Sequence, residues 1–384
     1  MSTLTPKQAA AIARGVYFLL DRSVSEVKNR GLSLGCEGMF HVGDDARFIG
    51  RTGGLIACKK LSGFGYIAAG EGTYQNELLI ATRGTKSGFD WLTNFNVGVQ
   101  MGPGGQLVHA GFNETWKSFS ADLANFLRGR NPSVIHCVGH SLGGALATLN
   151  ADYLSSIRAA EVKLYTFGSP RTGDNFFARS LSRRVTEKNM YRVHHRSDPV
   201  PKIPLFPFHH VPAEAAGYQL TAGPSGLINI NAHFMVDSYI PGVGELSWQT
   251  LGNQEAADEV DVQAWLGQVG AGGGGVLMGS AAVLQMIGKA LAWILGKVAS
   301  VALGGVFTAG MTVLDHLAWM LTKGAQASVE LSMYISAIIG AIFRFLGRTV
   351  VVGASLTTTF IRWVLELLYN GLAAVARRAL TLMQ

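Results

Sequence analysis

The chain has 384 residues, of which 48% are hydrophobic and 15% are charged, and its formal net charge is +7. This length suits two domains better than one small domain. A positive charge can indicate nucleic-acid binding, but the sequence has no recognition motif and no dense Lys/Arg cluster with interleaved aromatic residues, so no nucleic-acid partner is expected.

The N-terminus and the cysteines carry no sign of the general export route. Residues 1–14 lack a positively charged start followed by a long apolar run. Cys36, Cys58 and Cys137 are too few for a disulfide framework, so we expect reduced thiols. These features predict a protein that is made in the cytoplasm without a signal peptide.

Strand-like and helix-like patterns alternate along residues 1–269. The strand-like runs are residues 78–81, 133–138 and 162–167, and the helix-like runs are residues 116–127 and 142–157. Strands that alternate with helices predict an α/β domain, in which a largely parallel sheet is covered by helices on both faces.

The chain changes character at a glycine-rich segment, residues 270–275, which we expect to be a linker. Residues 276–384 are apolar stretches interrupted by eight basic and three acidic residues, a net charge of +5. The longest charge-free run, residues 298–314, has 17 residues, fewer than the roughly 20 that usually span a bilayer. This pattern predicts a hydrophobic helical region that associates with a membrane surface, or a bundle that packs on itself or on the first domain.

A candidate nucleophile follows the strand-like run that ends at residue 138. The sequence Gly139-His140-Ser141-Leu142-Gly143 lies between that strand and a predicted helix. A Gly-x-Ser-x-Gly motif in this context is typical of a nucleophile elbow, where the serine lies on a tight turn and the glycines let strand and helix pass closely. Ser141 is therefore the predicted nucleophile.

Such a serine needs a carboxylate and a base, which follow it in the order Ser, Asp, His. Asp198 lies in a loop directly after the strand-like residues 191–194, the position where α/β sheets place catalytic groups. We therefore expect Asp198 to be the acid.

The base is harder to assign from spacing. His194 and His195 precede Asp198 and break the required order, which leaves the histidines of a proline-rich loop and a later one. Spacing alone does not separate His210 from His233.

Seven runs of sequence between residues 78 and 239 resemble the fungal-type (class 3) lipases, which include phospholipases and feruloyl esterases. The runs are ATRGT (81–85), DWLTNF (90–95), VHAGF (108–112), VGHSLGGALA (138–147), YTFGSPRTG (165–173), YRVHHRSDPVP (191–201) and HFMVDSY (233–239). The resemblance implies an α/β-hydrolase fold for residues 1–269, whereas the apolar helical region 276–384 departs from the compact members of that family.

The resemblance also implies a role for each site residue. Asp198 would be the acid of a Ser-His-Asp triad and His233 its base, and His210 would have a supporting role. Thr85 matches the family's oxyanion residue, and the backbone N–H of Leu142 would be the second donor.

Residues 86–97 match the family's lid. Phe89, Trp91, Leu92 and Phe95 fall at helical spacing and would present an apolar face to lipid, although such aromatic stripes also occur in ordinary cores. No metal or other cofactor is expected, because the acidic residues lack ligand spacing.

These observations favour a lipase or phospholipase that hydrolyses carboxylic esters of lipids, with membrane phospholipids preferred. One hypothesis is a bacterial toxin effector that associates with membranes, is delivered by a specialised secretion system and has an immunity protein or secretion chaperone as partner. The alternatives are an intracellular triacylglycerol lipase on membranes or droplets, and a membrane-disrupting protein that carries a lipase domain.

Overall fold

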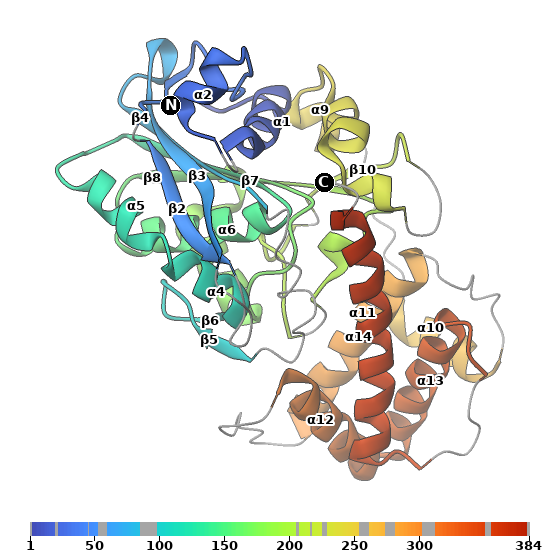
Figure 1. The fold of residues 1–384 in the computed structure, drawn as a ribbon. Coiled ribbons are helices and arrows are strands. Elements are labelled where there is room, and N and C mark those ends of the chain that lie inside the picture. The colour runs from blue at the N-terminus through green and yellow to red at the C-terminus, as the bar shows by residue number, and fades with distance from the viewer. Residues whose placement is uncertain are drawn as a thin grey trace.

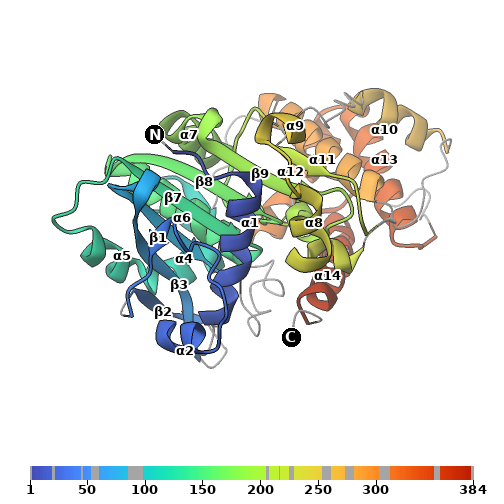
Figure 2. The same ribbon diagram turned by 90° about the horizontal axis from the view of Figure 1, so that it is seen from above.

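The computed structural model describes most of the chain. The described residues are 2–19, 22–44, 46–52, 60–84, 98–204, 207–215, 217–224, 229–252, 261–272, 281–301, 312–349 and 355–381. They form a sheet with helices on both faces, and the helices of the C-terminal region lie beside it (Figures 1 and 2).

The sheet has eight strands, and its main path runs in the order β1-β3-β4-β7-β8-β9-β10, with β2 paired to β3. The strands are β1 (Phe40–His41), β2 (Arg47–Thr52), β3 (Lys60–Gly70), β4 (Glu77–Thr82), β7 (Val134–His140), β8 (Glu161–Phe167), β9 (Met190–His195) and β10 (Tyr218–Leu220), and β5 (Val99–Met101) and β6 (Leu107–His109) form a separate hairpin. The pairs from β4 to β10 along this path are parallel. β3 is antiparallel to each of its partners, which are β1, β2 and β4. The parallel strands therefore end at one edge, where α/β sheets place their functional groups.

The fold-class prediction is confirmed, with one half of the sheet unforeseen. The four predicted strands overlap β4, β7, β8 and β9, and residues 142–157 contain α6 (Leu142–Ser156). The predicted helix at 116–127 is two helices, α4 (Ala110–Lys117) and α5 (Ser120–Leu127). The chain bends between them because Phe119 leaves the helical region, with φ −128° and ψ −1°. The antiparallel strands β1 to β3 had no clear sequence signal.

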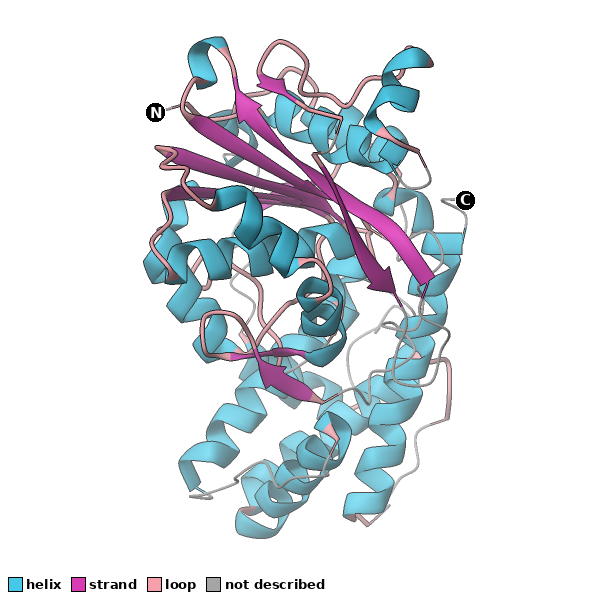
Figure 3. Cartoon of the chain, turned by 60° about the vertical axis from the view of Figure 1, so that its left-hand side comes forward, coloured by secondary structure: helices cyan, strands magenta, loops and turns pink. Residues whose placement is uncertain are grey.

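Each face of the sheet has its own apolar core. Alternate residues of β4 point to opposite faces, so that Leu78 and Ile80 pack with α4 to α7, whereas Leu79 and Ala81 pack with the N-terminal helices and with the segment after residue 235. The helices are α1 (Pro6–Gly15), α2 (Val24–Asn29), α7 (Asn175–Val185), α8 (Ile240–Val243) and α9 (Trp248–Gly252). Figure 3 shows the sheet enclosed between these two helical layers.

The C-terminal region is helical, as predicted. Its helices are α10 (Val262–Gly270), α11 (Ala281–Val301), α12 (Val313–Ala327), α13 (Val329–Phe345) and α14 (Thr358–Thr381). Their buried residues belong to the same apolar cluster as those of α6, so the packing is continuous from the sheet into these helices. None of the helices in the described residues combines the length and the apolar run that crossing a bilayer needs. Part of the predicted linker, residues 273–275, lies outside the described residues, and the division into domains stays a prediction.

Candidate active site

Ser141 lies on a sharp turn between the end of β7 and the start of α6. Its backbone has φ 59° and ψ −134°, a conformation that side-chain-bearing residues rarely adopt. The flanking glycines make the turn possible: a Cβ atom on Gly139 would lie 2.1 Å from the carbonyl oxygen of Gly143, and one on Gly143 would lie 2.4 Å from that of Thr82. The motif thus has the strand–turn–helix geometry of a nucleophile elbow.

Three residues that the sequence singled out meet at this turn. His233 Nε2 lies 2.9 Å from Ser141 Oγ, and His233 Nδ1 lies 2.8 Å from Asp198 Oδ2. Ser141 directly follows β7, Asp198 follows β9, and His233 is the last residue of the short helix η5 (Ile230–His233). All three side chains are fully buried. A base between a hydroxyl and a carboxylate is the arrangement that can activate a serine.

The carboxylate of Asp198 accepts hydrogen bonds on both oxygens. Oδ1 accepts the N–H of Val200 at 2.9 Å, and Oδ2 accepts the hydroxyl of Tyr239 at 2.6 Å besides facing His233. Burial alone would raise the pKa of Asp198, but the charge of His233 and these hydrogen bonds together hold that pKa below its ordinary value. The group is therefore a carboxylate at neutral pH.

His140, next to the nucleophile, contacts two other parts of the site. Its Nδ1 lies 2.8 Å from the hydroxyl of Tyr17, and its Nε2 lies 2.8 Å from the carbonyl oxygen of His233. Sequence reasoning assigned no role to Tyr17, His140 or Tyr239, although His140 and Tyr239 stand in the runs that carry the resemblance. Nothing in the local sequence around Tyr17 pointed to the site.

The predicted oxyanion donors are only partly within the described residues. Leu142 begins α6, and the first N–H groups of an α-helix have no partner within the helix. Thr85 lies outside the described residues, as do the four predicted lid residues, which are Phe89, Trp91, Leu92 and Phe95. Gly84, which precedes Thr85 in the sequence, donates its N–H to the Tyr17 hydroxyl at 3.2 Å.

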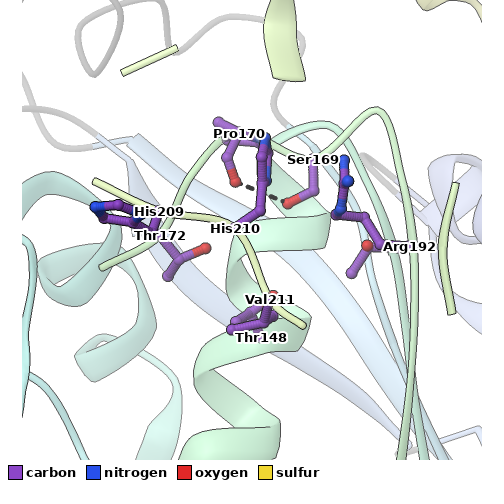
Figure 4. Close-up of a pocket in the computed structure, with 9 residues that line it drawn as sticks. Thr148, Ser169, Pro170, Thr172, Arg192, His209, His210 and Val211 are labelled. Carbon is purple, nitrogen blue, oxygen red and sulfur yellow. Dashed lines mark hydrogen bonds between the residues drawn. The ribbon is translucent and has the colours of Figure 1, made fainter. Parts of the chain in front are cut away.

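His210, the other candidate base, lies elsewhere. Its Nε2 is 2.7 Å from the carbonyl oxygen of Pro201, and its ring lines a cavity of about 10 Å³ together with Thr148, Ser169 and Arg192 (Figure 4). Burial, together with the charges of nearby arginines, holds the pKa of His210 well below its ordinary value. The structure brings His233, and not His210, to Ser141.

Within the described ranges, no group of three or more His, Cys, Asp or Glu side chains is placed to hold a metal ion. Consecutive hydrogen bonds join Ser141 Oγ to His233 and His233 to the Asp198 carboxylate. The chemistry that this arrangement can perform is therefore acyl transfer to a serine hydroxyl, with a histidine as proton carrier.

The part of the chain that carries Ser141 and Asp198 is similar to known proteins. Residues 79–208 match the family model described as lipase (class 3). Secreted mono- and diacylglycerol lipase 1 of Fusarium solani is 37% identical over 158 residues, 39% of this chain and 46% of that protein. Secreted mono- and diacylglycerol lipase A of Penicillium cyclopium is 34% identical over 154 residues, 38% of this chain and 48% of that protein.

More distant matches include a chloroplastic phospholipase A(1) of Arabidopsis thaliana, 27% identical over 34% of each chain. A crystal structure of a mutant form of MDLA from Penicillium cyclopium is 25% identical, covers 64% of this chain and 91% of that one, and has a TM-score of 0.40. The chain spans about half the length of the secreted fungal lipases that it matches.

The expectation of a membrane-associated protein that is made in the cytoplasm without a signal peptide and delivered by a specialised secretion system is wrong. The lipases of Fusarium solani and Penicillium cyclopium are named as secreted proteins, which points to an extracellular protein. The expectation depended on the composition of residues 1–14 and on the small number of cysteines. Neither feature outweighs likeness to secreted enzymes across the catalytic region.

Proposed function

We propose that this chain, which carries a class 3, fungal-type lipase region of the α/β-hydrolase superfamily, hydrolyses carboxylic esters of lipids with Ser141, His233 and Asp198 as its triad. One observation supports the proposal above all others. The imidazole of His233 lies between Ser141 Oγ at 2.9 Å and Asp198 Oδ2 at 2.8 Å. This geometry gives the base both its proton donor and its orienting carboxylate.

In the proposed reaction, Ser141 Oγ attacks the ester carbonyl carbon while His233 Nε2 takes the hydroxyl proton. His233 Nδ1 donates a hydrogen bond to Asp198, whose negative charge stabilises the charged imidazole. The backbone N–H of Leu142 and the Thr85 residue would bind the oxyanion. His233 gives the proton to the leaving alcohol, and a water molecule then hydrolyses the acyl-enzyme by the same route.

The substrate class that we propose is glycerolipids, both acylglycerols and glycerophospholipids. Relatives that match the catalytic region include mono- and diacylglycerol lipases and a phospholipase A(1). The preference for membrane phospholipids, the effector role, and the immunity protein or chaperone stay predictions from the sequence.

Serine-directed labelling tests the proposal. A fluorophosphonate should label the wild-type protein at Ser141, and Ser141→Ala should lose both labelling and release of fatty acid from mixed phospholipids and triglycerides, since only the attacking oxygen is removed. His233→Ala should lose activity to a similar extent, because triad members act as a unit. His210→Ala is the matched control and should retain most activity. Labelling at another residue, or a larger loss at His210 than at His233, would contradict this assignment.

A further inference from the structure

A chain of hydrogen bonds connects an N-terminal residue to both sides of the nucleophile. Tyr17 lies in the short helix η1 (Val16–Leu19), outside the region that matches the lipase family. Its hydroxyl contacts the N–H of Gly84 at 3.2 Å and Nδ1 of His140 at 2.8 Å, and His140 Nε2 contacts the carbonyl oxygen of His233 at 2.8 Å.

The partners fix the direction of every bond in this chain. The carbonyl oxygen of His233 can only accept, so His140 Nε2 must carry the hydrogen. In a neutral imidazole, Nδ1 is then an acceptor, and the Tyr17 hydroxyl must donate to it. The Tyr17 oxygen remains free to accept the N–H of Gly84. One arrangement of hydrogens therefore satisfies all three contacts.

The protonation states agree with this arrangement. Burial, helped by the charge of His233, lowers the pKa of His140 to about 3, so that the ring stays neutral. Burial also raises the pKa of Tyr17 to about 12, so that the hydroxyl keeps its proton. The protonation states of Tyr17 and His140 therefore stay the same over the pH range in which an ester hydrolase with a neutral base works.

The two ends of this chain lie on either side of Ser141. A Cβ atom placed on Gly84 would lie 3.2 Å from Ser141 Cβ, so the backbone of Gly84 packs against the nucleophile. The carbonyl oxygen of Gly84 accepts a hydrogen bond from Arg83, and therefore both polar groups of Gly84 are held. At the other end, the rings of His140 and His233 lie with their centroids 4.7 Å apart.

We propose that Tyr17 and His140 are positioning residues for ester hydrolysis, which hold the Gly84 backbone, next to the predicted oxyanion residue Thr85, at a fixed place relative to His233. This inference depends on the function proposed above. Displacement of a catalytic group by about 1 Å can lower the rate by as much as 100-fold. We therefore expect the link that Tyr17 and His140 make between the Gly84 backbone and His233 to have a larger effect on kcat than on KM.

Tyr17→Phe tests the inference, because it removes one hydroxyl and keeps the ring. We expect kcat on a soluble short-chain ester to fall about tenfold while KM changes less than about twofold, as for an interaction that acts in the transition state. The matched control is Tyr74→Phe, which removes a hydroxyl that lies 3.4 Å from Gln8 of α1 and away from the triad. This variant should keep the kcat of the wild type.

A double-mutant cycle with His140→Phe separates positioning from simple loss of stability. Once His140→Phe has broken the chain, Tyr17→Phe should cause little further loss of kcat, because the two residues act through one another. Three outcomes would overturn the inference, provided that the wild type shows Ser141-dependent hydrolysis. They are an unchanged kcat in Tyr17→Phe, a loss of kcat in Tyr74→Phe as large as that in Tyr17→Phe, and losses of kcat that multiply in the double variant. A wild-type protein without such hydrolysis would instead remove the proposed function itself, and this inference with it.

Discussion

Tyr239 donates its hydroxyl hydrogen to Oδ2 of Asp198 at 2.6 Å, the same oxygen that His233 Nδ1 approaches at 2.8 Å. The Tyr239 oxygen in turn accepts the N–H of His195 at 3.2 Å, which fixes the tyrosine to the end of β9. The acid of the proposed triad is therefore held by a residue six positions beyond the base. This contact ties the segment that carries His233 to the loop that carries Asp198.

Tyr239→Phe should remove one hydrogen bond to the Asp198 carboxylate and leave the carboxylate in place. Hydrogen bonds to charged groups contribute about 1.5–3 kcal/mol, so we expect kcat to fall about 10- to 100-fold. The pKa of Asp198 lies below its ordinary value in the folded protein, and loss of a donor should raise that pKa. The acid limit of activity should therefore move to higher pH, as a pH profile of ester hydrolysis would show. Tyr66→Phe, whose hydroxyl faces the Leu34 carbonyl oxygen at 3.4 Å, is the control, and identical profiles for both variants would contradict the prediction.

Gly168→Ala should remove most activity, because the triad leaves no room for a methyl group there. Gly168 has φ 55°, and a Cβ atom on it would lie 2.9 Å from Asp198 Oδ2, 2.9 Å from the Tyr239 hydroxyl and 3.1 Å from His233 Nδ1. Gly31→Ala is a matched control: Gly31 has φ 65° and nothing within 4 Å of the added Cβ, so it carries the backbone cost alone. We expect a modest loss of thermal stability without loss of turnover in Gly31→Ala, and a larger loss of thermal stability together with loss of turnover in Gly168→Ala. Full activity of Gly168→Ala would show that the acid tolerates displacement.

The sequence predicted the residues whose signal is local. The elbow of Ser141 follows from a five-residue motif between a strand and a helix, and Asp198 from its place after a strand. Spacing could not choose between His210 and His233, because the choice depends on how the chain folds back onto β7, and the resemblance was needed to favour His233. Tyr17 could not be found at all, since it meets His140 across 123 positions of sequence and stands in a segment without a motif.

A buried histidine–carboxylate pair should make the free energy of unfolding depend on pH. His136 Nε2 lies 2.7 Å from Glu77 Oε2, with the His136 side chain fully buried. Burial, partly offset by Glu77, lowers the pKa of His136, and the pKa of Glu77 is also lowered because the hydrogen bonds of His136 and Ser2 outweigh its burial. The unfolded chain therefore binds more protons as the pH falls below about 6.5, and stability should fall by up to about 1.4 kcal/mol per pH unit for each proton.

Denaturant titrations between pH 7 and pH 5 would measure this dependence. His136→Gln should make the slope less steep, because the amide can still donate to Glu77 but does not titrate. His41→Gln is the control, since the His41–Glu71 pair is exposed and 3.7 Å apart, and it should leave the slope as in the wild type. An unchanged slope in His136→Gln would assign the pH dependence to other groups.

The last prediction concerns the helices after residue 272. These helices pack against the part of the chain that carries His233. α14 packs against η5, the helix that ends at His233, and the buried side chains of α11 to α14 share one apolar cluster with α6. A protein that ends at residue 272 would expose that cluster, so we expect it to aggregate and to lose hydrolysis of a soluble ester.

A point variant tests the packing of α14 without truncation. Leu368 of α14 has no exposed surface, so Leu368→Ala should lower the free energy of unfolding by about 2–5 kcal/mol through loss of buried area and the cavity left behind. Val329→Ala is the control, because Val329 lies at the start of α13 with 80% of its surface exposed and should cost far less. Thermal unfolding and soluble-ester kinetics on both variants and on the truncated protein would measure the effect. A truncated protein that stays monomeric and keeps its soluble-ester activity would show that these helices fold apart from the catalytic region, and their buried surface would then need another explanation.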